Sequence, residues 1–168
     1  MLKPGLEQLL HLTHSALAEM RSLLLELRPS TLLETGLAEL IKQLAETVGG
    51  KSHLEVELEL DSTCVVPPDV HIGLYRIAQE ALNNVVKHAR ASRVLMSLSQ
   101  RGTGVELSVR DDGRGFDPRQ VMPGHFGLGI MRERAESLGL EYTISSQPDV
   151  GTEIEVRYYR ATGEEPEQ

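Results

Sequence analysis

The spacing of apolar residues along the chain predicts its helices. Apolar residues recur every three or four positions in residues 6–27 and 37–48, which predicts two helices. A third helix is expected over residues 67–89, because proline suits a first helical turn and apolar residues follow at helical spacing. A shorter helix is expected over residues 130–138, ended by Gly139.

Alternation of apolar and polar residues predicts the strands. Residues 53–60 alternate strictly, and residues 93–100 and 104–111 are expected to form a hairpin. A second hairpin is expected from residues 140–146 and 152–159. This order of elements predicts an α+β fold, a two-layer sandwich with helices on one face of a mostly antiparallel mixed sheet and an additional N-terminal helix.

Composition narrows the classes of partner. The chain has 168 residues, enough for one globular domain with an extra element, and a formal net charge of −8. That charge argues against nucleic acid or an anionic membrane, so a phosphate-rich ligand would need local donors. The single cysteine, Cys64, fits a reducing cytoplasm and is expected to be a buried packing residue.

An acidic, glycine-rich motif, D-D-G-R-G-F, follows one predicted strand directly at residues 111–116. Asp111 ends the strand, and Gly113 and Gly115 let the backbone pass close to a ligand. An ionised carboxylate only accepts hydrogen bonds, so Asp111 could bind the exocyclic amine of adenine, where guanine has a carbonyl. On this motif alone, a turn with solvated acids remains the alternative.

A polar stripe lies on the long predicted helix. Glu80, Asn84 and His88 are four residues apart and share a face. Carboxylate and amide oxygens suit Mg²⁺, and Lys87 and His88 could meet phosphate oxygens nearby. The alternative is a solvated face of a half-buried helix, although Asn83 and Asn84 are unfavourable inside a helix.

Gly127, Leu128 and Gly129 directly precede the short predicted helix. The first backbone N–H groups of a helix, together with its dipole, attract anions, so these residues are candidates for phosphate binding. The Gly/Pro-rich residues 113–125 suit a lid, and Thr152 could add a hydroxyl to the site. Ordinary turns and an ordinary hairpin are the alternatives.

Two histidines stand apart from these motifs. His11 and His14 are three residues apart on the first predicted helix, as in a metal pair or a phosphoacceptor. No cysteine or further histidine lies nearby, and no acidic residue directly follows either of them. We therefore expect neither role.

The motifs, in this order, resemble those of the ATP-binding domain of sensor histidine kinases, within the superfamily of gyrase B, the heat-shock chaperone ATPases and the mismatch-repair ATPases. The resemblance covers residues 54–159 and implies the Bergerat-type ATP-binding fold. Glu80 and Asn84 resemble the N box, and residues 111–115 resemble the glycine box that binds adenine. Residues 127–129 resemble the second glycine box, and Thr152 the end of the final Gly-Thr.

Longer matches point to the subfamily that signals to response regulators with helix-turn-helix output, which includes nitrate sensors and a sensor of membrane fluidity. Residues 75–89 are very similar to its N box, and residues 124–135 to its second glycine region. Residues 26–37 resemble the junction between its dimerisation hairpin and its catalytic domain.

The resemblance implies a domain organisation. Residues 1–29 would belong to the second helix of the dimerisation hairpin, residues 30–160 to the catalytic domain and residues 161–168 to a disordered tail. The acceptor histidine of the subfamily precedes the point where this chain begins, so we expect a piece of a longer protein. The parent would be a homodimer and a membrane-bound bacterial sensor, with this part in the cytoplasm.

The resemblance also implies roles for the N box and the first glycine box. Asn84 would bind Mg²⁺, Glu80 would hold a metal-bound water, and Lys87 and His88 would lie near phosphate. Asp111 would bind the adenine amine. Family members transfer the γ-phosphoryl group of ATP to a histidine, chiefly by positioning and charge neutralisation.

Residues 127–129 would line the phosphates under a mobile lid.

Two other functions remain open at this point. One is a stand-alone ATPase or serine kinase of the same superfamily, and the other is a non-catalytic interaction module whose glycines only form turns.

Overall fold

The computed structural model describes residues 32–49, 54–118 and 126–159. The chain divides into two compact units, Met1–Thr35 and Gly36–Gln168, and the fold below belongs to the second. The helix expected over residues 6–27, with His11 and His14, lies outside the described residues. Most of the expected lid and the C-terminal tail lie outside them too.

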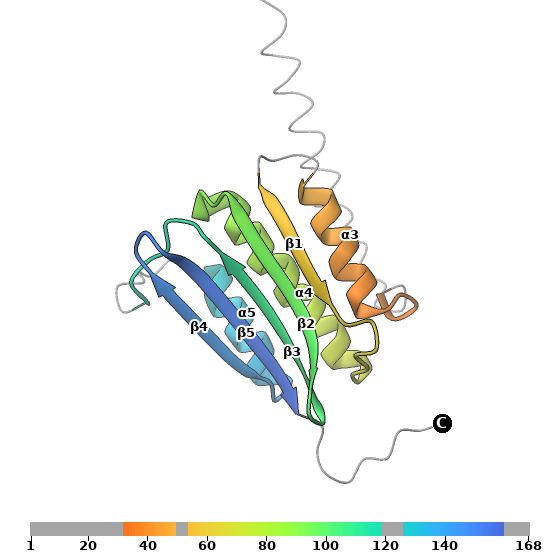
Figure 1. Cartoon of the computed structure of the whole chain (residues 1–168). Helices are drawn as coiled ribbons and strands as arrows, with labels where there is room; N and C mark the ends of the chain where they lie inside the picture. The colour runs from red at the N-terminus through yellow and green to blue at the C-terminus, as the bar shows by residue number, and fades with distance from the viewer. Residues whose placement is uncertain (1–31, 50–53, 119–125, 160–168) are drawn as a thin grey trace, which may run out of the picture. The chain divides into compact units, whose positions relative to one another are not determined.

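The described residues form a five-stranded sheet with the order β1-β2-β3-β5-β4 (Figure 1). Strand β1 pairs in parallel with β2, and the other neighbours pair antiparallel, so the mostly antiparallel mixed sheet is confirmed. The strands are β1 (Glu55–Leu60), β2 (Arg93–Arg101), β3 (Gly104–Asp111), β4 (Glu141–Gln147) and β5 (Gly151–Tyr159). The two predicted hairpins are therefore β2–β3 and β4–β5.

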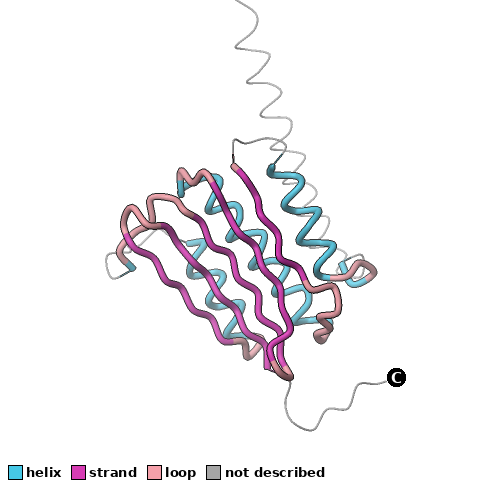
Figure 2. The backbone as a smooth tube through the Cα atoms, in the orientation of Figure 1, coloured by secondary structure: helices cyan, strands magenta, loops and turns pink. Residues whose placement is uncertain are grey.

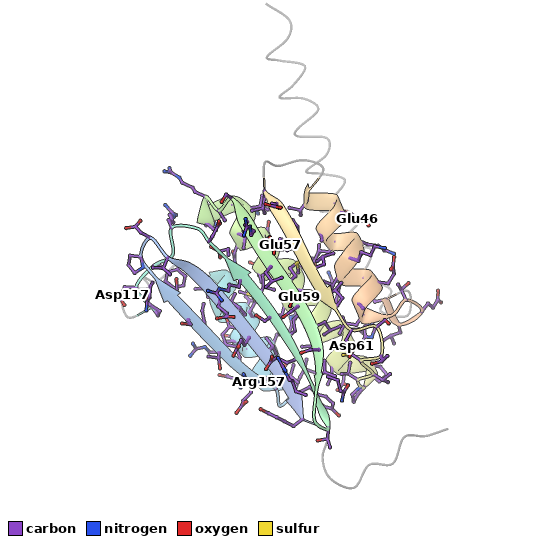
Figure 3. All side chains as sticks on the ribbon, viewed as in Figure 1. Glu46, Glu57, Glu59, Asp61, Asp117 and Arg157 are labelled. Carbon is purple, nitrogen blue, oxygen red and sulfur yellow. The ribbon has the colours of Figure 1, made fainter. Side chains whose placement is uncertain are left out.

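Helices α3 (Leu37–Gly49), α4 (Pro68–Asn84) and α5 (Phe126–Ser137) all lie on one face of the sheet (Figures 1 and 2). The core between the two layers is aliphatic, as the composition suggests. It includes these fully buried side chains: Ile41, Leu74, Ile77, Leu82, Met96, Leu98, Leu107 and Val156. The open face of the sheet is charged, and Figure 3 labels Glu57, Glu59 and Arg157 on it. This alternation explains why the strands could be recognised from the sequence.

The last turn of the long helix differs from the expectation of a continuous α-helix to Ala89. The α-helix ends at Asn84, and Val85–Ala89 form a π-helical turn, η1. Arg90 then leaves the helix in the left-handed conformation, with φ of 53°. Such wider turns are frequent at functional sites, and this one carries Lys87 and His88.

Helix α5 begins at Phe126, four residues before the expected start. Glycine is a poor helix former, so the sequence pattern placed the boundary after Gly129. The end agrees with the prediction, because Gly139 follows the helix with φ of 66°. Residues 127–129 are therefore the first turn of the helix rather than the loop before it.

Candidate nucleotide-binding site

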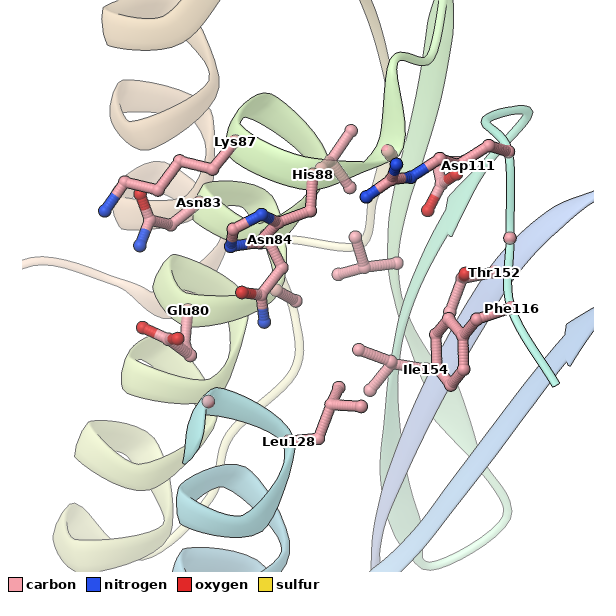
Figure 4. A pocket seen from close by; sticks show the side chains of 17 residues that line it. Glu80, Asn83, Asn84, Lys87, His88, Asp111, Phe116, Leu128, Thr152 and Ile154 are labelled. Carbon is pink, nitrogen blue, oxygen red and sulfur yellow. The ribbon is translucent and has the colours of Figure 1, made fainter. Parts of the chain in front are cut away.

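A cavity of about 550 Å³ lies between the helix layer and strands β3 and β5 (Figure 4). It brings together residues from all the predicted motifs, including Asn84 and Asp111 from opposite walls. The following residues line it: Glu80, Ala81, Asn83, Asn84, Val85, Lys87, His88, Ala89, Val109, Asp111, Arg114, Gly115, Phe116, Gly127, Leu128, Thr152 and Ile154.

The strand wall of the cavity consists of two cross-strand pairs. Asp111 pairs with Thr152, and Val109 pairs with Ile154. Since every second residue of a strand faces the same side, each polar residue is accompanied by an apolar one deeper along the same face. The wall thus offers hydrogen-bonding groups at one end and an apolar surface for a flat ring beside them. Val109 and Ile154 were not predicted as site residues, although alternation from Asp111 and Thr152 indicates them.

Asp111 is 7% exposed. The backbone N–H of Gly113 donates to its Oδ1 at 2.8 Å. Burial raises the pKa of the Asp111 carboxyl, the hydrogen bond from Gly113 opposes this shift, and the neighbouring charge of Asp112 adds to it. The backbone of Thr152 also opposes the rise in this pKa through a hydrogen bond. A buried carboxylate has further lone pairs and is a strong acceptor for a ligand N–H group.

Gly113 is close to the cavity but is not one of its lining residues. A Cβ at Gly113 would lie 2.5 Å from the carbonyl oxygen of Ala89 and 2.7 Å from Asp111 Oδ1. Glycine is therefore needed at this position to let the turn pack against the end of η1 and donate to Asp111.

The loop after Asp111 is held from both sides. The N–H of Arg114 donates to the Ala89 carbonyl at 2.8 Å, and the Arg114 carbonyl accepts from Asp149 N–H at 2.7 Å. Gly115 has φ of 53°, and a Cβ there would overlap the carbonyl oxygen of Gln147. These contacts place Arg114 and Phe116 against the cavity. Neither side chain was predicted as a site residue, since the motif pattern drew attention to its acids and glycines.

The helix wall carries the predicted polar stripe. Glu80 and Asn84 lie one turn apart on α4, and Lys87 and His88 follow on η1. In Figure 4 the Lys87 side chain extends away from Asp111. Asn83 also lines the cavity, as the unfavourable Asn-Asn pair suggests. Asn83 itself was not predicted as a site residue.

The side-chain amide of Asn84 has a hydrogen-bond donor available for a ligand. Among the described residues its Nδ2 is buried and has no hydrogen-bond partner. Leaving a buried donor unsatisfied costs roughly 1–3 kcal/mol, so an acceptor bound in the cavity would remove that cost.

The first turn of α5 closes the cavity next to α4. A Cβ at Gly127 would collide with Glu80 Oε1 and would lie 3.2 Å from Asn84 Nδ2. Gly127 and Leu128 line the cavity, whereas Gly129 is exposed and is not a lining residue. The early N–H groups of this helix lack intrahelical partners, so the anion-binding capacity predicted for this segment remains.

The donor set of the helix wall fits Mg²⁺. Glu80 and Asn84 supply a carboxylate and an amide oxygen, the hard ligands that this ion prefers. Within the described residues there is no group of three or more His, Cys, Asp or Glu side chains that could hold a metal. Magnesium usually keeps several waters and binds substrate phosphates, so a small protein donor set suits it.

Comparison with known proteins places these observations in a family. Residues 69–162 match the family model described as histidine kinase-, DNA gyrase B- and HSP90-like ATPase. The sensor histidine kinase LiaS of Bacillus subtilis is 38% identical over 147 residues, which cover 88% of this chain and 41% of LiaS. The sensor protein VraS of Staphylococcus aureus is 36% identical over 160 residues, or 93% of this chain and 46% of VraS. The chain thus spans less than half the length of these relatives.

Solved structures of histidine kinase domains have a similar fold. The histidine kinase domain of a blue-light activated kinase of Erythrobacter litoralis superposes with a TM-score of 0.63 and 26% identity, covering 73% of this chain and 60% of that one. The ATP-binding domain of PrrB from Mycobacterium tuberculosis gives a TM-score of 0.60 and 25% identity, covering 73% and 93%.

No helix within the described ranges is long and apolar enough to cross a membrane. The residue pattern, the fold and the relatives all lead to one assignment. The chain belongs to the histidine kinase-, DNA gyrase B- and HSP90-like ATPase family, in which it groups with the ATPase domains of sensor histidine kinases.

Proposed function

We propose that this chain is the ATP-binding catalytic domain of a two-component sensor histidine kinase, and that the 550 Å³ cavity holds Mg·ATP. The observation that carries the proposal is the convergence of the Asp111–Thr152 pair and the Glu80–Asn84 turn on one cavity. The relatives support it, since LiaS and VraS are named as sensor proteins.

In this proposal the strand wall binds adenine. Asp111 accepts a hydrogen bond from the exocyclic amine, Thr152 lies beside it, and Val109 and Ile154 contact the ring. The turn built on Gly113 and Gly115 holds the edge of the base. A purine with a carbonyl in place of the amine would face the carboxylate acceptor with another acceptor and bind less well.

The helix wall would hold the phosphate end. Asn84 binds Mg²⁺ through its amide oxygen, and Glu80 holds a metal-bound water. When bound, the ion would neutralise charge on the β- and γ-phosphates. Lys87, His88 and the N–H groups of residues 127–129 would supply the local positive potential that a chain of net charge −8 otherwise lacks.

The reaction itself needs a second domain. The γ-phosphorus would form a bond to an imidazole nitrogen of the acceptor histidine as the bond to the β–γ bridging oxygen breaks, leaving ADP. We assign residues 1–29 to the dimerisation hairpin, residues 30–160 to the catalytic domain and residues 161–168 to a tail. The acceptor hairpin, a homodimeric and membrane-bound parent, and a response regulator with helix-turn-helix output complete the proposal.

Two measurements test this function. Isothermal titration with Mg·ATP should give saturable binding to the folded chain, and absence of heat would favour a non-catalytic interaction module. Mixing the chain with ATP and a fragment that carries the acceptor hairpin should then yield phosphohistidine. Binding of ATP without any phosphohistidine would favour a stand-alone ATPase or serine kinase.

The metal assignment has its own test. Replacing Asn84 with Ala should remove the enhancement of nucleotide binding by Mg²⁺, because the amide oxygen is the protein ligand. Titrations with and without Mg²⁺ would measure this enhancement for both proteins. An equal enhancement in Asn84→Ala would contradict the role of Asn84.

A further inference from the structure

A buried serine outside the predicted motifs lies beside the strand wall, on the neighbouring strand β4. Ser146 is the penultimate residue of β4, is 9% exposed and pairs with Thr152 of β5. It does not line the cavity, yet it contacts two elements that do. No sequence signal marked this residue, because a serine in a strand belongs to no motif with known chemistry.

The Ser146 hydroxyl has three hydrogen-bond partners. Its Oγ accepts from the backbone N–H of Phe116 at 2.9 Å, lies 2.9 Å from Thr152 Oγ1 and donates to the Gly151 carbonyl at 3.1 Å. One hydroxyl therefore joins the loop that follows Asp111 to the first residues of β5. A hydroxyl has one proton and two lone pairs, so these contacts use its capacity fully.

The two elements joined at this point also touch through backbone contacts. Asp149 N–H donates to the Arg114 carbonyl, and Gly115 packs against the Gln147 carbonyl. These contacts hold the loop to the end of β4 and to the β4–β5 turn, and a Cβ at Gly115 would also lie 2.8 Å from the Gly151 carbonyl oxygen. All of them are contacts with backbone atoms, and none reaches a side chain of the strand wall. Among these contacts only the Ser146 hydroxyl orients the Thr152 hydroxyl as well as Phe116.

We infer that Ser146 is a positioning residue for base selectivity, which rests on the proposed ATP-binding function. It acts through Phe116 and Thr152 and does not itself touch the nucleotide. By fixing the loop and the Thr152 hydroxyl beside Asp111, it holds the corner of the site that distinguishes an amine from a carbonyl on the purine.

The test compares ATP with ITP, in which a carbonyl replaces the amine of adenine. Dissociation constants for both nucleotides with Mg²⁺ are measured for the unaltered chain, Ser146→Ala, Ser146→Thr and the control Ser145→Ala. Ser145 is the adjacent residue, exposed on the opposite face of β4. We expect Ser146→Ala to weaken ATP binding about tenfold and ITP binding less than about threefold, since only ATP uses the amine contact.

The conservative variant Ser146→Thr should restore most of the ATP preference, and Ser145→Ala should leave it unchanged. A purely structural role would lower the melting temperature of Ser146→Ala while leaving the ATP-to-ITP ratio intact, which would overturn the inference. An equal loss of preference in Ser146→Ala and Ser146→Thr would overturn it too.

If Ser146→Ala does not fold, Ser146→Cys replaces it, because a thiol is of similar size and a much weaker donor and acceptor. Failure of the unaltered chain to bind ATP would instead reject the proposed function. The two failures are therefore distinguishable in one set of titrations.

Discussion

Asp111 and Asp112 are neighbours in the sequence, yet their surroundings are opposite. Asp111 is buried at the cavity, and burial raises the pKa of its carboxyl. Asp112 is exposed and accepts hydrogen bonds from Ser92 N–H, Ser92 Oγ and Arg93 N–H at 2.9, 2.6 and 2.9 Å. The Ser92 hydroxyl, followed by the N–H of Arg93, lowers the pKa of the Asp112 carboxyl.

The difference follows from where β3 ends. Asp111 is the last residue of the strand and faces the helix layer together with Val109, whereas Asp112 begins the loop and fastens it to the start of β2. One acid therefore keeps acceptor capacity for a ligand, and the other uses that capacity within the fold. Residue type alone does not separate these roles, but position relative to the strand does.

Replacing each acid by its amide should have the largest effect on ATP binding and should separate the two residues most clearly. Asp111→Asn should weaken Mg·ATP binding by more than tenfold, or ~1.4 kcal/mol, because a charge-assisted hydrogen bond to the adenine amine is lost. Asp112→Asn is the matched control and should change the dissociation constant by less than about twofold, since its contacts lie within the protein. Isothermal titration measures both, and unchanged affinity in Asp111→Asn would reject the adenine assignment.

Gly127 and Gly129 of α5 show a similar contrast between a residue at the cavity and one beside it that is exposed. An alanine at Gly127 would meet Glu80 Oε1, the mobile end of a side chain, so it should displace Glu80 rather than unfold the protein. We expect Gly127→Ala to weaken Mg·ATP binding about fivefold, ~1 kcal/mol.

Gly129→Ala is the control for this variant. No atom lies within 4 Å of a Cβ at Gly129, and alanine forms helix better than glycine, so the variant should be more stable, by at most about 1 kcal/mol. Alanine keeps the backbone N–H that is the proposed contribution of this position, so ATP affinity should be unchanged. Equal losses of affinity in the two variants would show that Gly127 has no special place in the site.

Asp112 should contribute to the stability of the fold. Asp112→Ala removes the acceptor for three donors of the β2 start and should lower the free energy of unfolding at pH 7 by about 1 kcal/mol. Because the pKa of Asp112 is lowered by folding, this stabilisation is present above the ordinary carboxyl pKa of about 3.9 and is lost as pH falls through the folded value. Urea unfolding at pH 7 and at pH values falling below about 3.9 measures it, and a difference that does not shrink as pH falls would contradict this explanation.

Much of this molecule could be predicted from periodicity. The alternation of residues 93–100 and 104–111 gives the β2–β3 hairpin, because one face of the sheet is buried and the other is charged. The start of α5 was missed because Gly127 and Gly129 disfavour helix locally, whereas in the folded chain Gly127 packs closely against Glu80 and Asn84 within the first turn. Tertiary contacts override local propensity at this point.

The site residues also divide into those that a local pattern predicts and those that only contacts between distant segments place. Glu80, Asn84, Asp111 and Thr152 belong to motifs with chemistry that the sequence displays, and all line the cavity. Phe116 and Ser146 reach their places through contacts between distant strands and loops, which no local pattern encodes. Phe116 was assigned because it lines the cavity, and Ser146 because the register of β4 against β5 places it opposite Thr152.

The smallest effect that we expect is the change in stability of the ligand-free protein when Asp111 is replaced. Folding raises the pKa of this carboxyl, so its contribution to stability is fully present below the ordinary value of about 3.9 and is lost as pH rises through the folded value. Asp111→Asn, which carries no charge to bury, should therefore be more stable than the unaltered chain at pH 7, and this gain should disappear toward pH 3. Urea unfolding without nucleotide measures the trend, which has the opposite sign to that of Asp112→Ala. A loss of stability at pH 7 in Asp111→Asn would mean that the carboxylate is satisfied within the fold, like that of Asp112, and is not held in reserve for a ligand.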